Sequence, residues 1–231
     1  MDQQKPPEFI LDVFTDPRSV REVIKGILHT IFFNRFFPSV APLTRDVLDL
    51  TLPYVNDDEL ETMIQSRANA LERQLDAERS SATARSPASY SSSPSTTAAG
   101  NPPAPSSSAS SSSAAAAALD LGGSGGRGQI SVQFFEKRRR KAWLSRGDEE
   151  VCWESWTIKV TVAEPRTESE RAKVRRAMEQ TLLTTVMKIV SFVNTHKDHI
   201  PPITTQGANP FPYKINVESR ETGWAARMRI Y

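Results

Sequence analysis

The predicted fold rests mainly on residues 129–163, which read QISVQFFEKRRRKAWLSRGDEEVCWESWTIKVTVA. Residues 129–136 alternate apolar and polar side chains, which is the pattern of a strand with one buried face. Residues 151–163 form a second strand, and the loop 137–150 lies between the two. In the second strand one face carries Trp156, Ile158, Val160 and Val162, and the other carries Trp153, Lys159 and Thr161. The stretch therefore predicts a β-hairpin with a long connecting loop.

A strand and a helix are expected at the start of the chain. Residues 8–14 are apolar and read as a short strand. Asp16 and Pro17 then begin a helix over 16–37, because a carboxylate caps helices and proline suits the first helical position.

A second extended segment and a second helix follow. Residues 44–55 form one extended segment, in which Pro53 indicates an edge strand or a bulge. Asn56 and Glu59 have the spacing of a capping box, so they predict a helix over 56–78.

The longest helix is expected after the hairpin, over 167–197, where Thr167 and Glu170 form another capping box. Its apolar stripe consists of Val174, Met178, Leu182, Val186, Ile189 and Val193, widened by Leu183, Met187 and Val190. So broad a stripe predicts a helix that is buried on a sheet over much of its circumference. Extended segments at 213–217 and 224–231 complete the elements. Helices and strands are mixed without regular alternation, so the predicted class is α+β.

Between the second helix and the hairpin, residues 79–128 consist almost entirely of Ser, Ala, Pro, Thr and Gly. Such a segment has too little apolar surface to offset the entropy lost on ordering, and we expect a disordered insert. The parts 1–78 and 129–231 together have roughly 180 residues, enough for one hydrophobic core and therefore for a single domain.

Composition favours a soluble, cytoplasmic protein. The 29 basic and 27 acidic residues nearly balance, so charge alone does not indicate nucleic acid. A single cysteine, Cys152, excludes an internal disulfide framework and suits a reducing compartment. The N-terminus lacks the pattern of a signal peptide, and the apolar segment 27–37 is too short to span a bilayer.

No motif for catalysis or cofactor binding stands out, so neither an enzyme nor a cofactor is expected. A glycine-rich phosphate loop and a Gly-x-Ser-x-Gly elbow are both missing from the sequence. His196 and His199 have no Cys or Glu at ligand spacing, and no metal site is predicted. His29 reads as a partly buried side chain with one hydrogen bond, and Cys152 as an unreactive thiol in a strand.

The loop of the hairpin carries a dense basic run followed by a large aromatic side chain. The run consists of Lys137, Arg138, Arg139, Arg140 and Lys141, and Trp143 and Leu144 follow it. An aromatic at a polar loop tip is a candidate anchor for a partner protein, although Trp143 could equally fold back onto its own sheet. The cations could instead contact anionic lipid headgroups. No nucleic-acid-binding fold accompanies the run, so nucleic acid is not expected.

Four stretches resemble the autophagy-related protein 101 family. They are ILHTIFFNR at 27–35, GQISVQFFEKRRRKAW at 128–143, WESWTIKVTV at 153–162 and PYKINV at 212–217. The resemblance implies a HORMA fold, in which a mixed or antiparallel sheet packs against three helices, here 16–37, 56–78 and 167–197. Outside the insert it covers nearly all of the folded part.

The resemblance also implies a function without catalysis. Members of this family pair with the HORMA domain of autophagy-related protein 13 within the autophagy-initiating kinase complex, which assembles at the phagophore assembly site. They present an exposed loop with Trp and Phe that recruits downstream autophagy factors. Trp143 falls on the tryptophan of that loop, whereas Leu144 and Ser145 stand where the phenylalanine would be. Leu144 is the apolar residue that would replace it.

Overall fold

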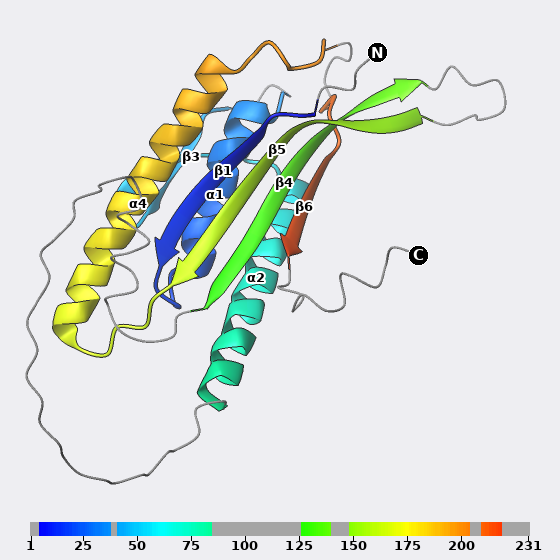
Figure 1. Ribbon diagram of the computed structural model, residues 1–231. Coiled ribbons are helices and arrows are strands. Elements are labelled where there is room, and N and C mark those ends of the chain that lie inside the picture. The colour runs from blue at the N-terminus through cyan, green and yellow to red at the C-terminus, as the bar shows by residue number, and fades with distance from the viewer. Residues whose placement is uncertain (1–4, 38–40, 85–125, 140–147, 204–208, 219–231) are drawn as a thin grey trace, which may run out of the picture.

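The computed structural model describes residues 5–37, 41–84, 126–139, 148–203 and 209–218, and shows a mixed α+β architecture (Figure 1). Its elements in chain order are β1 (Glu8–Thr15), α1 (Val20–Arg35), β2 (Leu43–Val47), β3 (Leu50–Tyr54), α2 (Asp58–Ala84), β4 (Arg127–Arg139), β5 (Asp148–Val162), α4 (Glu168–Thr195) and β6 (Tyr213–Glu218). A four-stranded sheet has the order β1-β5-β4-β6, and β2 pairs with β3 in a separate hairpin. The predicted α+β class is confirmed.

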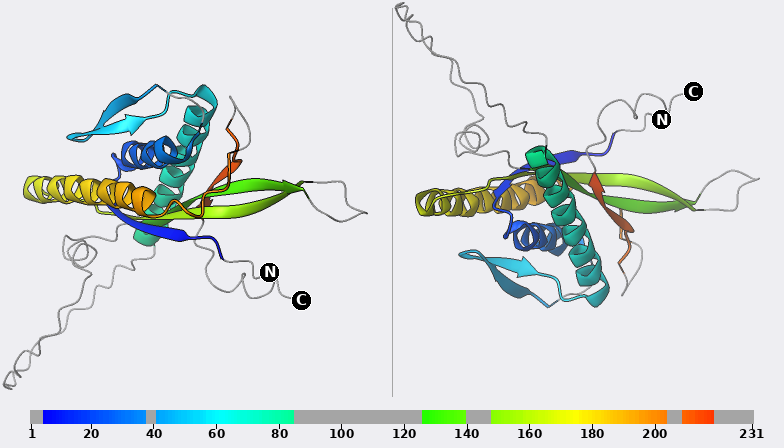
Figure 2. Two further views of the ribbon diagram at one scale, coloured as in Figure 1. Left: turned by 90° about the horizontal axis from the view of Figure 1, so that it is seen from above. Right: turned by 90° about the horizontal axis from the view of Figure 1, so that it is seen from below.

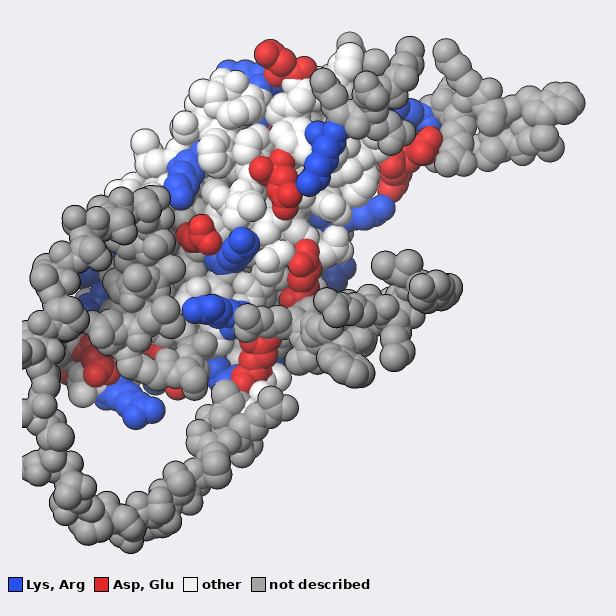
Figure 3. Space-filling model, in the orientation of Figure 1, with Lys and Arg blue, Asp and Glu red and all other residues white. Residues whose placement is uncertain are grey.

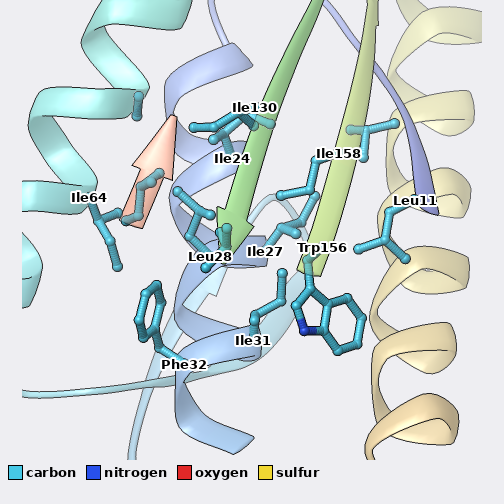
Figure 4. Close-up of a cluster of buried hydrophobic side chains, with 14 of the residues drawn as sticks. Leu11, Ile24, Ile27, Leu28, Ile31, Phe32, Ile64, Ile130, Trp156 and Ile158 are labelled. Atoms are coloured by element: carbon cyan, nitrogen blue, oxygen red, sulfur yellow. The ribbon is translucent and has the colours of Figure 1, made fainter. Parts of the chain in front are cut away.

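The three helices of the described chain lie on the side of the sheet that carries the core. Helix α1 lies against the sheet, with α4 beside β1 and α2 beside β4 and β6 (Figure 2). Buried side chains fill the space between them, including Leu11, Ile24, Ile27, Leu28, Ile31, Phe32, Ile64, Ile130, Trp156 and Ile158 (Figure 4). Because all of these are apolar and almost fully enclosed, their burial is the main stabilising contribution to the fold.

Strands β4 and β5 form the antiparallel hairpin that the sequence predicts, but both are longer than expected. The predicted loop 137–150 is wrong at both ends, because 137–139 pair with 148–150 in register. Lys137, Arg138 and Arg139 of β4 pair with acidic residues of β5. Opposite charges across an antiparallel pair stabilise pairing that a charged sequence alone does not suggest.

A β-bulge changes the face on which Trp153 lies. The register between β4 and β5 shifts between Phe134 and Phe135, so that Phe134 pairs with Glu154 and Phe135 with Cys152. The prediction that Trp153 shares the outer face with Lys159 is therefore wrong, since Trp153 is only 6% exposed and packs against Phe134. An extra residue in one strand interrupts the alternation on which that prediction rested.

The first strand and helix follow the prediction with a shifted boundary. Strand β1 pairs in parallel with β5, and α1 begins at Val20 rather than at Asp16. The Asp16 carboxylate accepts a hydrogen bond of 2.7 Å from the backbone N–H of Ser19, which makes a turn before the helix. Asp16 thus ends the strand and orders the turn that leads into α1.

The predicted single extended segment 44–55 is wrong, since it is a tight hairpin of β2 and β3. Leu48 in the turn has φ of 53°, a left-handed conformation that leucine rarely adopts. Its side chain is partly buried against the core, and this packing offsets the strain. The apolar pattern continues through the turn, which is why the sequence reads as one strand.

The cap of helix α2 lies one position later than predicted. Asp57, not Asn56, caps it, because the Asp57 carboxylate accepts from the backbone N–H of Leu60 at 2.8 Å. The helix runs on to Ala84, beyond the predicted end at 78. Most of the predicted insert 79–128 and the predicted strand 224–231 lie outside the described residues.

Candidate protein-docking site

The β4–β5 hairpin projects beyond the rest of the sheet. Strand β6 ends its pairing with β4 at Tyr213 opposite Phe134, and one further hydrogen bond joins the Phe135 N–H to the Pro212 carbonyl at 2.8 Å. Beyond that point only β4 and β5 pair with each other, which leaves a two-stranded extension (Figure 1). We call residues 135–139 and 148–152 the hairpin arm.

Charge pairs line the hairpin arm. In register, Lys137 faces Glu150, Arg138 faces Glu149 and Arg139 faces Asp148. The Arg138 side chain donates to the Glu136 carboxylate of its own strand at 2.6 Å, and Lys214 of β6 donates to Glu150 at 2.8 Å. That bond from Lys214 holds the pKa of Glu150 below its ordinary value. The arm is thus nearly neutral although the β4 sequence is strongly basic.

Only part of the predicted binding run is described. Lys137 and Arg138 lie exposed on the arm, and the backbone of Arg139 pairs with β5. The remaining predicted residues, Arg140, Lys141, Trp143 and Leu144, lie outside the described residues. The described part of the arm ends at the pair Arg139 and Asp148.

Helix α4 carries an exposed apolar stripe that the sequence reading missed. Leu183 is 48% exposed, Met187 59% and Val190 39%. Their spacing places them along one side of the helix over two turns. The prediction that these three side chains widen the buried face is wrong. We call them the α4 stripe.

The geometry of α4 explains this exposure. The capping box at Thr167 and Glu170 is confirmed, with both hydrogen bonds present. The buried side of the helix is narrow and consists of Val174, Met178, Leu182, Thr185, Ile189 and Val193. Because α4 lies at the β1 edge of the sheet, the sheet and α1 cover one side only (Figure 2). The apolar residues of α4 span an arc that is wider than one neighbouring layer can cover. This width is the signal that could have identified the stripe from the sequence.

Among the described residues, Glu154 is the buried carboxylate that makes the most hydrogen bonds. It is fully buried and accepts from Arg35 Nε at 2.9 Å and from Trp156 Nε1 at 2.6 Å. Its other oxygen lies 2.7 Å from His199 Nε2. These bonds tie α1, β5 and the segment after α4 together, which is a structural role.

The remaining candidate reactive groups do not converge. His29 has the single predicted hydrogen bond, to Glu61 at 2.7 Å, but at 2% exposed it is more deeply buried than the sequence predicts. Burial raises the pKa of the Cys152 thiol above its ordinary value. Within the described ranges, no group of three His, Cys, Asp or Glu side chains could hold a metal ion.

Two further observations concern the helices and the surface charge. None of the helices in the described part of the chain is long and apolar enough to cross a membrane. On the sheet face seen in Figure 3, Lys and Arg side chains are interspersed with Asp and Glu. A surface of mixed sign gives no strong general attraction for polyanions.

Comparisons with known proteins agree on one family. The model of the family "Autophagy-related protein 101" matches residues 12–207. The protein of that name from Schizosaccharomyces pombe is 23% identical over 209 residues, which cover 90% of this chain and 85% of the relative. The Arabidopsis thaliana protein is 24% identical over 225 residues, with 87% and 81% covered.

A more local match has higher identity. The human autophagy-related protein 101 is 32% identical over 108 residues, which cover 42% of this chain and 48% of the human protein. The family match spans α1, the hairpin arm and α4. The chain therefore belongs to the autophagy-related protein 101 family, and this membership implies a role in the initiation of autophagy.

Proposed function

We propose that this chain is a non-catalytic adaptor of the autophagy-initiating kinase complex, and that it pairs with the HORMA domain of autophagy-related protein 13. The observation that carries the proposal is the α4 stripe. Three neighbouring apolar side chains, each at least 39% exposed, form a contiguous patch of the kind that marks protein interfaces. Covering them in a partner removes apolar surface from water and stabilises the complex.

The rigidity of α4 supports this role. The helix is capped at Thr167, and its opposite side is held in the core through Leu182 and Ile189. A preformed helix loses little conformational entropy on binding, so more of the contact energy appears as affinity.

The hairpin arm supplies the second contact in this proposal. Trp143 and Leu144, which follow the described part of β4 in the chain, act as apolar anchors that recruit downstream autophagy factors. Lys137, Arg138 and Arg139 pair across the two strands with acidic residues. This pairing favours a protein contact over the binding of anionic membranes through the basic run 137–141.

Co-purification tests the pairing. The full chain and the HORMA domain of autophagy-related protein 13, mixed at micromolar concentration, should elute together in size-exclusion chromatography. The Trp143→Ala variant should still form this complex while losing its capture of downstream factors, because Trp143 is not part of the α4 stripe. If both folded proteins elute separately, the pairing is refuted.

A further inference from the structure

A pocket of about 230 Å³ lies between α1, α2 and the β2–β3 hairpin. None of its lining residues belongs to the α4 stripe or to the hairpin arm. It is therefore a separate feature, and the proposed adaptor function makes no use of it.

The base of the pocket is apolar because the hairpin lies directly on α1. A Cβ atom at Gly26 would come within 2.9 Å of Leu52 Cδ1 and 3.1 Å of Val47 Cγ2, so only glycine permits this approach. Val47 and Leu52 are buried there, at 1% and 4% exposed, and the Tyr54 ring lies tilted against the His29 ring, with centroids 4.4 Å apart. Val47, Leu52 and Tyr54 form what we call the pocket floor.

Two arginines stand at the rim with unused hydrogen-bond donors. Arg21 is 50% exposed, and its nearest carboxylate, Glu72, is 3.9 Å away. Arg45 is 44% exposed, 3.6 Å from Glu61, and its guanidinium lies 4.1 Å above the centre of the Tyr54 ring. Among the described residues neither guanidinium makes a hydrogen bond, because both separations exceed hydrogen-bond distance.

The third cation of the pocket, Lys25, already has hydrogen-bond partners. Lys25 donates to Glu61 at 2.7 Å and to Gln65 at 2.6 Å. Burial alone would raise the pKa of Glu61, but hydrogen bonds from Lys25 and His29 outweigh it and keep that pKa below its ordinary value. Glu61 is thus an ionised partner for Lys25, and the arginines remain the donors available to a ligand.

We propose that this pocket binds an acidic peptide segment of a partner protein. One large apolar side chain of the segment covers the pocket floor, and neighbouring Asp or Glu side chains bind Arg21 and Arg45. Arginine suits this task because its planar donors match a carboxylate. Cations outnumber the single acidic lining residue, Glu22.

The size of the pocket excludes larger ligands and argues against a bare anion. Sites for drug-sized ligands and cofactors have volumes of roughly 300–1,000 Å³, so this one suits a single side chain. A small carboxylate without an apolar group would leave Val47 and Leu52 uncovered. It would not gain the free energy that comes from burying apolar surface.

The test is a titration of the full ¹⁵N-labelled chain with the peptide acetyl-Glu-Asp-Phe-Asp-Glu-amide, followed by NMR. Saturable shifts are expected at the amides of Gly26, Val47, Leu52 and Tyr54. The double variant Arg21→Ser/Arg45→Ser should weaken binding about tenfold or more, because two charge-assisted contacts are lost. Replacing Phe by Ala in the peptide should weaken it as well.

Arg18→Ser/Arg67→Ser is the matched control, since it removes the same charge from two exposed arginines outside the pocket. It should bind like the unmodified chain. Equal loss in both double variants, unsaturable shifts, or equal binding of the Ala peptide would each overturn the proposal. The variant Met187→Asp separates this inference from the proposed function, because it should leave peptide binding unchanged.

Discussion

The Arg35 Nε atom donates to both carboxylate oxygens of Glu154 at 2.9 Å, and the two side chains are 3% and 0% exposed. Arg35 ends α1 and Glu154 lies in β5, next to the bulge. Because both charges are removed from water, each depends on the other for compensation.

The Glu154→Ala variant should therefore be strongly destabilised. It leaves the Arg35 guanidinium buried without its counter-charge, and removing one member of a buried pair costs about 3–5 kcal/mol. Urea denaturation measures the change in the free energy of unfolding. Arg171→Ala, which breaks an exposed pair with Glu168, is the control and should cost about 0.5 kcal/mol or less. Equal losses would show that Glu154 is not the anchor inferred here.

His29 should make stability depend on pH. Burial lowers its pKa below the ordinary value of 6.5, and outweighs the opposing effect of Glu61. The unfolded chain then takes up a proton at higher pH than the folded protein does. The free energy of unfolding should fall as pH drops below 6.5 toward the folded-state pKa, and recover above 6.5.

The comparison that tests this is His29→Gln against the unmodified chain, by urea denaturation across that pH range. Glutamine keeps an N–H donor for Glu61 but does not titrate, so the variant should show a flatter pH dependence. His196→Gln changes an exposed histidine and serves as the control. An unchanged slope in His29→Gln would rule out this histidine as the source.

Much of the architecture was predictable, because local signals and tertiary packing agree. The capping box of α4 and the alternation in β4 depend on neighbouring residues only, and both were placed correctly. Trp153 was assigned to the wrong face because its position depends on a bulge. The bulge lies where Phe134 packs on Trp153, and an assignment that assumes strict alternation along the strand cannot place it.

The candidate site was less predictable for a related reason. Leu183, Met187 and Val190 continue the apolar pattern of α4, so a sequence cannot tell whether the chain itself or a partner covers them. The rim of the pocket has no sequence signature either. Arg21 and Arg45 come from different elements, which meet where the β2–β3 hairpin lies against Gly26 of α1.

Replacing Arg138, Arg139 and Arg140 by Ser separates the two uses of the basic run. If the run serves to bind anionic membranes, flotation with phosphatidylserine vesicles should fall with rising salt and be lost in this variant. The charge pairing of the arm predicts instead that the unmodified chain floats weakly, and that the variant still pairs with autophagy-related protein 13. Strong, salt-sensitive flotation that the variant loses would contradict the account.

We propose that the α4 stripe is the surface that binds the partner. Isothermal titration calorimetry with the HORMA domain of autophagy-related protein 13 tests it most directly, on the variants Met187→Asp and Thr184→Asp. Both place one carboxylate at an exposed position of α4, but only Met187 belongs to the stripe. We predict that Met187→Asp weakens binding by about tenfold or more, since a charge at an apolar contact must be desolvated without a partner, while Thr184→Asp binds like the unmodified chain. Full affinity in Met187→Asp would contradict the claim.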